Sequence, residues 1–165
     1  MFSSIIRRQS VVSAPSICPS SITPALTLGA MYTAHAALPH LLAAAKQEPR
    51  RVADLVLTSS VAGRLVRLGS GVYNASKHAV GAFAEALRME VTERHVRVSL
   101  IEPGAVETEL VSHNRPEVQE RLRERLGTVE LLRAHDIAQT IAFVVTRPRH
   151  VALNEVLIRP TEQEG

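Results

Sequence analysis

The chain has 165 residues, of which 45% are hydrophobic and 21% charged, a balance typical of a soluble globular domain. Its net charge of +3 is carried by arginines scattered along the chain, and only 3% of the residues are aromatic, so nucleic-acid binding is not indicated. The single cysteine, Cys18, excludes an internal disulfide, and no group of cysteines and histidines has metal-ligand spacing. We therefore expect a cytoplasmic protein without a metal site or membrane contact.

Residues 1–24 differ from the rest of the chain because they are rich in serine and proline and contain no acidic residue. Organellar transit peptides share this composition, but two arginines are few for such a peptide. Unrelated codons in front of an intact downstream domain explain the segment better. We therefore divide the chain into an irregular segment, 1–24, and a domain, 25–165.

The domain begins with a predicted helix and strand. From Leu26 to Leu42, apolar residues recur at three- and four-residue steps, which predicts a helix that ends before Arg51. Pro39 is expected to bend this helix. The following run, 52–59, is nearly all apolar, which predicts a parallel strand buried on both faces.

Three residues that follow this strand have the chemistry of a proton-transfer site. Ser60 comes directly after the strand, and Tyr73 and Lys77 lie four residues apart in a helix predicted over 73–94. Residues i and i+4 share a helix face, so the Lys77 ammonium can stabilise the ionised phenol of Tyr73. The Ser60 hydroxyl can then hold a substrate oxygen near that phenol. A tyrosine and a lysine at this spacing are, taken alone, more often a pair on the surface of an amphipathic helix. The neighbouring sequence therefore decides between a surface pair and a proton-transfer site.

Three further elements follow: a strand over 96–101, a helix over 137–146 and a strand over 155–159. Pro103 and Gly104 break the first of these strands at the carboxyl edge of the sheet, where open α/β sheets bind their ligands. Asp136 is expected to be the N-cap of the helix. Arg115 and Arg121 belong to a charged stretch that is either a solvated helix face or a contact for a carboxylate substrate.

Three segments occur in the order and at the spacing of the short-chain dehydrogenase/reductase family, which the chain resembles from about 29 to 161: Thr58-Ser59-Ser60-Val61-Ala62-Gly63, Tyr73 to Lys77, and Ile101-Glu102-Pro103-Gly104-Ala105-Val106-Glu107-Thr108. The resemblance implies an α/β fold, a Rossmann-like three-layer sandwich with a parallel sheet. It also implies that Tyr73 gives or takes the alcohol proton, that Lys77 assists it and holds the nicotinamide ribose, and that Ser60 orients the carbonyl.

The same resemblance implies a cofactor, NAD or NADP. The backbone of Pro103, Gly104 and Val106 would face the nicotinamide, and the Thr108 hydroxyl would contact its carboxamide or a phosphate. The ending, 154–161, resembles the branch of the family that oxidises small 3-hydroxy acids and serine-like alcohols with NADP, so NADP is preferred. Residues 109–128 correspond to a mobile flap over the substrate.

The chain departs from the family at its beginning. The opening strand and the G-x-x-x-G-x-G turn, which receives the cofactor pyrophosphate, have no counterpart. Leu26 stands where the family has an asparagine that completes the catalytic tetrad. We therefore expect a truncated domain that lacks the N-terminal half of the fold. The strand at 52–58 would have an open edge, and marginal stability or aggregation would follow.

Three functions remain open from the sequence. The first is an NAD(P)-dependent oxidoreductase that interconverts an alcohol and a carbonyl on a small substrate, impaired in this truncated chain. The second is a catalytically inactive remnant, since hydride transfer needs a fixed nicotinamide. The third is an interaction module that forms a homo-oligomer, or joins a longer relative, through the helices at about 29–47 and 73–94.

Overall fold

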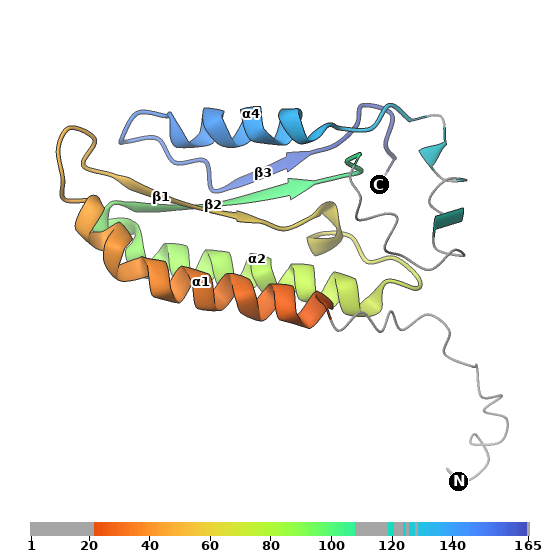
Figure 1. The fold of residues 1–165 in the computed structure, drawn as a ribbon, viewed down its shortest axis with the longest axis horizontal. Helices are drawn as coiled ribbons and strands as arrows, with labels where there is room; N and C mark the ends of the chain where they lie inside the picture. Colours follow the sequence, from red (N-terminus) through yellow and green to blue (C-terminus); the bar gives the residue numbers. More distant parts are fainter. Residues whose placement is uncertain (1–21, 108–118, 121–123, 125, 128, 165) are drawn as a thin grey trace, which may run out of the picture.

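The structure is a computed structural model that describes residues 22–107, 119–120, 124, 126–127 and 129–164 (Figure 1). Thr108, Arg115 and Arg121 lie outside the described residues, as does most of the segment predicted to form a flap. Three helices and three strands make up most of the fold: α1 (Ile22–Ala44), β1 (Ala53–Thr58), α2 (Gly71–Val91), β2 (Val96–Pro103), α4 (Ala134–Val145) and β3 (Glu155–Ile158).

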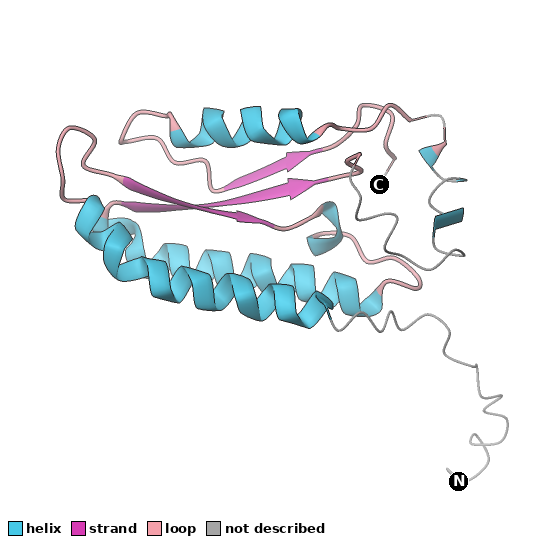
Figure 2. Ribbon diagram, viewed as in Figure 1, coloured by secondary structure: helices cyan, strands magenta, loops and turns pink. Residues whose placement is uncertain are grey.

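The strands form one parallel sheet in the order β1-β2-β3. Ala53 pairs with Val96 at the start of the β1–β2 ladder, and Leu100 pairs with Glu155 at the start of the β2–β3 ladder. Helices α1 and α2 cover one face of the sheet, and α4 covers the other (Figure 2). The predicted α/β fold, a Rossmann-like three-layer sandwich with a parallel sheet, is therefore confirmed.

The main core lies between the sheet and the pair α1 and α2. Alternate residues of a strand point to the same face, so one face of β1 and β2 supplies half of this core and the two helices supply the rest. Its buried members are Ala34, Ala45, Ala53, Leu57, Val80, Ala84, Leu87, Val91, Val96, Val98 and Leu100. Small residues on α1 and α2 let both helices approach the sheet and each other closely.

The two longer strands differ in burial. Every residue of β2 is buried, as expected of a strand covered on both faces. In β1, by contrast, Leu55 and Val56 are only partly buried and Thr58 is exposed. The predicted burial of the run 52–59 on both faces is therefore only partly present, whereas β1 does have the predicted open edge, since it is an edge strand of the described sheet.

Two helix starts differ from the predictions. Helix α2 begins at Gly71, two residues before Tyr73, and a short 3-10 turn, η2 (Thr92–Arg94), continues it to the predicted end. Helix α4 begins at Ala134, so Asp136 is not its N-cap. Instead, the Asp136 carboxylate accepts the backbone N–H of Arg133 at 2.7 Å, so it satisfies a backbone donor from inside the first turn.

Helix α1 runs without a break through Pro39, from Ile22 to Ala44. It therefore starts three residues before the predicted domain boundary at 24/25. None of the helices in the described part of the chain is long and apolar enough to span a lipid bilayer.

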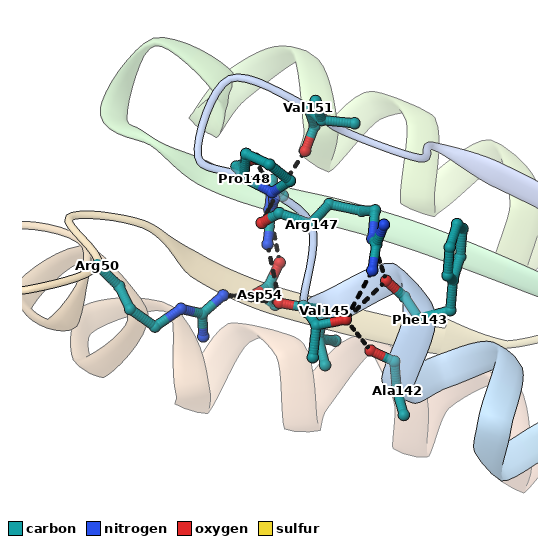
Figure 3. Close-up of polar contacts among 10 residues, drawn as sticks. Arg50, Asp54, Ala142, Phe143, Val145, Arg147, Pro148 and Val151 are labelled. Atoms are coloured by element: carbon teal, nitrogen blue, oxygen red, sulfur yellow. Dashed lines mark hydrogen bonds and ion pairs between the residues drawn. The ribbon is translucent and has the colours of Figure 1, made fainter.

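A buried arginine joins the layers at the amino ends of the strands. The side chain of Arg97, on β2, is 7% exposed, and its Nε donates to Asp54 Oδ1 at 2.7 Å. Its two terminal nitrogens donate to the carbonyl oxygens of four residues in the segment from α4 to β3. Figure 3 labels these four residues: Val145, Arg147, Pro148 and Val151. Arg50 donates to the second carboxylate oxygen of Asp54 at 2.8 Å. One guanidinium thus ties β1, β2 and the end of α4 together.

Candidate functional site

Tyr73 and Lys77 lie on one face of α2, in its first two turns. The Lys77 Nζ is 5.7 Å from the centroid of the Tyr73 ring, within the range of a cation–π contact. Both side chains are partly buried. Burial lowers the pKa of the Lys77 ammonium from its ordinary value of 10.5, because the charged form loses hydration. The predicted pairing of an ammonium with a phenol is therefore present.

Ser60 stands where the chain leaves β1 and turns into the 3-10 helix η1 (Val61–Gly63), of which it is the N-cap. Its Oγ accepts the N–H of Ala62 at 3.2 Å and donates to the carbonyl oxygen of Pro103 at 3.4 Å. The second contact is long for a hydroxyl donor, so little energy holds the hydroxyl proton there. Ser60 thus lies beside the end of β2, at the carboxyl edge of the sheet.

The segment after β1 is fastened to α2 by two residues that the sequence analysis did not select. Asn74 is buried, and its Nδ2 donates to the carbonyl oxygens of Ala62 at 2.9 Å and Leu65 at 2.6 Å. Ser59 Oγ donates to the carbonyl oxygen of Lys77 at 3.1 Å. These bonds fix the turn that carries Ser60 against the turns of α2 that carry Tyr73 and Lys77. A buried asparagine needs such partners, but its position beside Tyr73 was the only signal in the sequence.

An ion-pair cluster holds the same turn to the sheet. Arg64, directly after η1, donates through Nε to Glu102 on β2 at 2.5 Å, and through Nη2 to Glu155 on β3. The hydrogen bonds to Glu102 and Glu155 raise the pKa of Arg64 above its usual value. Because Glu102 is buried, this pairing satisfies a carboxylate that would otherwise be costly there. The sequence analysis missed this cluster, since the three residues are far apart in the chain.

Beyond β2, the chain turns back along the carboxyl edge of the sheet. Three backbone N–H groups of this turn have partners: that of Gly104 donates to Ile158, that of Ala105 to the Gln163 side chain, and that of Glu107 to Leu132. Within the described part of the chain, the N–H of Val106 has no such partner. The turn therefore keeps one backbone donor for a ligand.

A scan against family models matches residues 25–119 to the short chain dehydrogenase family. The chain belongs to this family. It is 40% identical over 109 residues to an uncharacterized oxidoreductase of Mycobacterium tuberculosis, an alignment that covers 66% of this chain and 43% of the relative. It is 31% identical over 132 residues to an uncharacterized oxidoreductase of Staphylococcus aureus, covering 80% of this chain and 50% of the relative. The chain thus spans about half the length of the curated relatives it matches.

Solved structures agree with this assignment. A serine dehydrogenase in complex with NADP+ superimposes with a TM-score of 0.70 at 29% identity, over 83% of this chain and 53% of that structure. The serine dehydrogenase of Escherichia coli gives a TM-score of 0.64 at 26% identity, over 85% of this chain and 52% of the other. The predicted resemblance to this family and to its serine dehydrogenase branch is confirmed.

The predicted site residues lie together at the carboxyl ends of β1 and β2. Ser60 and Pro103 are in direct contact, and Tyr73 and Lys77 form a pair. Gly104 and Val106 follow Pro103 in the turn, while Thr108 is outside the described residues. Asn74, Ser59 and Arg64 are the supporting residues that the motifs alone did not reveal. The chemical roles of the site residues remain predictions.

Proposed function

We propose that this chain belongs to an NAD(P)-dependent oxidoreductase that interconverts an alcohol and a carbonyl on a small substrate. The observation that carries the proposal is the Tyr73–Lys77 pair on α2, held next to Ser60 by the hydrogen bonds of Asn74 and Ser59. A phenol, an ammonium and a hydroxyl at one edge of a parallel sheet suit proton transfer to or from a substrate oxygen.

The donors at this edge fit a nicotinamide cofactor. The Lys77 ammonium makes no hydrogen bond to a described residue, and the Val106 amide is likewise free to donate to a ligand. An ammonium suits ribose hydroxyls, and a backbone N–H suits a carboxamide oxygen. Tyr73, Lys77 and the turn of Pro103, Gly104 and Val106 would hold the nicotinamide end, with Thr108 after them. When bound, this group supplies or accepts the hydride.

Tyr73, Lys77 and Ser60 have separate roles in the proposed proton transfer. The Tyr73 hydroxyl gives its proton to the substrate oxygen in reduction and takes it back in oxidation. The Lys77 ammonium stabilises the phenolate by its positive charge, which acts strongly because the group is partly buried. The Ser60 hydroxyl, released from its long contact to Pro103, donates to the same substrate oxygen and fixes its position.

For the cofactor and substrate, we propose NADP and a small 3-hydroxy acid or serine-like alcohol. The support is the similarity to a serine dehydrogenase that was solved with NADP+. The chain covers 53% of that structure.

We also propose a cytoplasmic location and a homo-oligomer formed through α1 and α2. The outer surface of these helices carries large hydrophobic side chains that are more than half exposed: Leu26, Leu28, Tyr32 and Met89. Exposed apolar groups on neighbouring helices favour association with another molecule. No nucleic-acid or membrane partner is part of this proposal.

The test uses the two tyrosines of the chain. NADPH and NADH are titrated into the purified protein while nicotinamide fluorescence and the melting temperature are followed, and small carbonyl substrates are then assayed. We expect saturable binding, and a fall in kcat of about 10²- to 10⁴-fold for Tyr73→Phe. Tyr32→Phe, on the exposed side of α1, is the matched control and should keep the rate.

The titration also separates the proposed enzyme from the alternatives. A folded chain that binds neither cofactor at millimolar concentration would overturn the proposed function and leave an inactive remnant or an interaction module. Equal rates for Tyr73→Phe and the unmodified protein would reject the role of Tyr73 alone.

A further inference from the structure

A pocket lies at the opposite end of the sheet from the candidate site, where the strands begin. Its volume is about 300 Å³, and Leu42 and Ala45 of the α1 end form its apolar wall. The other lining residues carry nitrogen donors: Lys46, Arg51, Arg94, His95 and Arg149. They come from three separate parts of the chain, namely the connection from α1 to β1, the end of η2 and the loop before β3. None of the described residues that line the pocket carries a carboxylate.

The positive charge of this pocket is not neutralised by its surroundings. Glu48 is 3.5 Å from Arg51 Nε, and this carboxylate is 74% exposed, so water screens it. The C-terminal ends of two helical segments face the same region, and each contributes about half a negative charge. Four lysine and arginine side chains line the pocket, against one nearby carboxylate. These cationic residues are exposed and therefore hydrated, and an anion between them would gain several charge-assisted hydrogen bonds.

Contacts within the pocket hold its donors in place. Arg149 Nε donates to the carbonyl oxygen of Arg51 at 2.9 Å, and its Nη2 lies 2.7 Å from His95 Nε2. A guanidinium has five N–H groups, so three remain for a ligand. Arg94 uses one N–H on the carbonyl oxygen of Glu90 at 3.2 Å. The Lys46 ammonium makes no hydrogen bond to a described residue.

The backbone of the pocket is unusual as well. Arg51 has φ of 50° and His95 has φ of 61°, and these are the two non-glycine residues with positive φ in the described part of the chain. Left-handed backbone is disfavoured for residues with a side chain and often marks ligand sites. Both residues line the same pocket. His95 takes this conformation as the C-cap of η2, and Arg51 takes it in the connection that leads into β1.

We propose that this pocket binds an anion of the phosphate class, such as inorganic phosphate or a small phosphate monoester. Lys46, Arg94 and Arg149 supply charged donors to the phosphate oxygens, and Leu42 offers an apolar surface to an organic group attached to it. The site lies at the other end of the strands from Ser60 and Lys77, so it is independent of the proposed oxidoreductase function.

The first experiment is a titration of the full chain with inorganic phosphate at constant ionic strength, followed by calorimetry and by the NMR signals of the histidine rings. We expect saturable binding that shifts the His95 signals and leaves those of His78, on α2 near the catalytic pair, unchanged. Lys46→Gln and Arg94→Gln should each weaken binding about tenfold or more, because each removes a charged hydrogen bond. Arg88→Gln, at a partly exposed arginine that pairs with Glu85 outside the pocket, is the control and should change the affinity less than about twofold.

Circular dichroism of each variant without phosphate establishes that it is folded. A small monoester such as glycerol 3-phosphate then distinguishes the ligand source: tighter binding than phosphate supports a monoester site, and equal binding supports a site for the free ion. The proposal is overturned if binding does not saturate, if Arg88→Gln weakens it as much as the pocket variants, or if His95 does not respond.

Discussion

At the amino ends of the strands, the guanidinium of Arg97 is buried among oxygen acceptors, whereas at the carboxyl ends the ammonium of Lys77 lies over the ring of Tyr73 and makes no hydrogen bond to a described residue. The Arg97 guanidinium stabilises the fold, since it donates hydrogen bonds to Asp54 and to four carbonyl oxygens. The Lys77 ammonium is desolvated without a hydrogen bond to a described residue, which lowers its pKa.

The two cations thus have different roles at the two ends of one sheet: Arg97 stabilises the fold, and Lys77 is proposed to hold a ligand. A buried ion pair with complete hydrogen bonding joins elements that are distant in sequence, and removing one partner leaves an uncompensated charge. A partly buried ammonium without a partner costs stability but is ready to hold a ligand. Sites for chemistry are commonly placed where the fold leaves polar groups unsatisfied, and their support is placed elsewhere.

Substitution of Arg97 should have the largest effect on stability. We expect Arg97→Leu to lower the free energy of unfolding by about 3–5 kcal/mol, because Asp54 and four carbonyl oxygens lose a buried partner. Urea unfolding followed by circular dichroism measures the change. Arg88→Leu is the matched control: this arginine pairs with Glu85 on the surface of α2, and its loss should leave stability nearly unchanged. Equal effects of the two variants would show that Arg97 is not the joint between the layers.

Substitutions at two glycines test how closely η1 approaches α2 at the carboxyl end of the sheet. A Cβ on Gly63 would lie 3.0 Å from the carbonyl oxygen of Lys77 and 3.1 Å from Ser59 Oγ, whereas one on Gly29 in α1 would meet nothing within 4 Å. We therefore expect Gly63→Ala to destabilise the protein by about 1–3 kcal/mol. Gly29→Ala should stabilise it by about 0.5–1 kcal/mol, since alanine favours a helix. Melting temperatures that move in the same direction would contradict the close approach of η1 to α2.

Removal of Lys77 should have the smallest effect and a characteristic pH dependence. Because its folded-state pKa is below 10.5, the unfolded chain binds more protons between the two values, so stability rises with pH in that window. Lys77→Met should flatten this rise and raise stability near neutral pH by less than about 1 kcal/mol, as the group is partly hydrated. Thermal unfolding from pH 7 to 10.5 measures both. Lys46→Met, which removes the other lysine, is the control, and an unchanged slope in Lys77→Met would reject the desolvated ammonium.

Much of the fold follows from local sequence patterns. The apolar runs of β1 and β2, the spacing of Tyr73 and Lys77, and the Pro103-Gly104 break all predict elements that the structure contains. Local patterns did not reveal which strand is covered on both faces, because burial depends on strand order. This is why the run at 52–59 was predicted to be more buried than β1 is.

The supporting contacts could not be predicted in the same way. Asp54 and Arg97 are 43 positions apart, and Arg64 and Glu155 are 91 apart, so only the folded sheet brings them together. Asp136 was assigned as an N-cap because it precedes an apolar run, but the helix starts earlier and the carboxylate caps it from inside. Within the candidate site, the motifs predicted the reacting groups, and the structure added the residues that hold the predicted groups in place.

The contact of Gln163 with the turn after β2 has a practical consequence for handling the protein. Its Oε1 accepts the Ala105 N–H at 2.8 Å and fills the space above Gly104, where a Cβ would lie only 2.3 Å away. A bulky affinity tag or fluorophore attached near this residue would press on the same turn that offers the Val106 amide. Labels for binding assays are therefore better attached near the end of α4, on its exposed side, which faces away from the sheet.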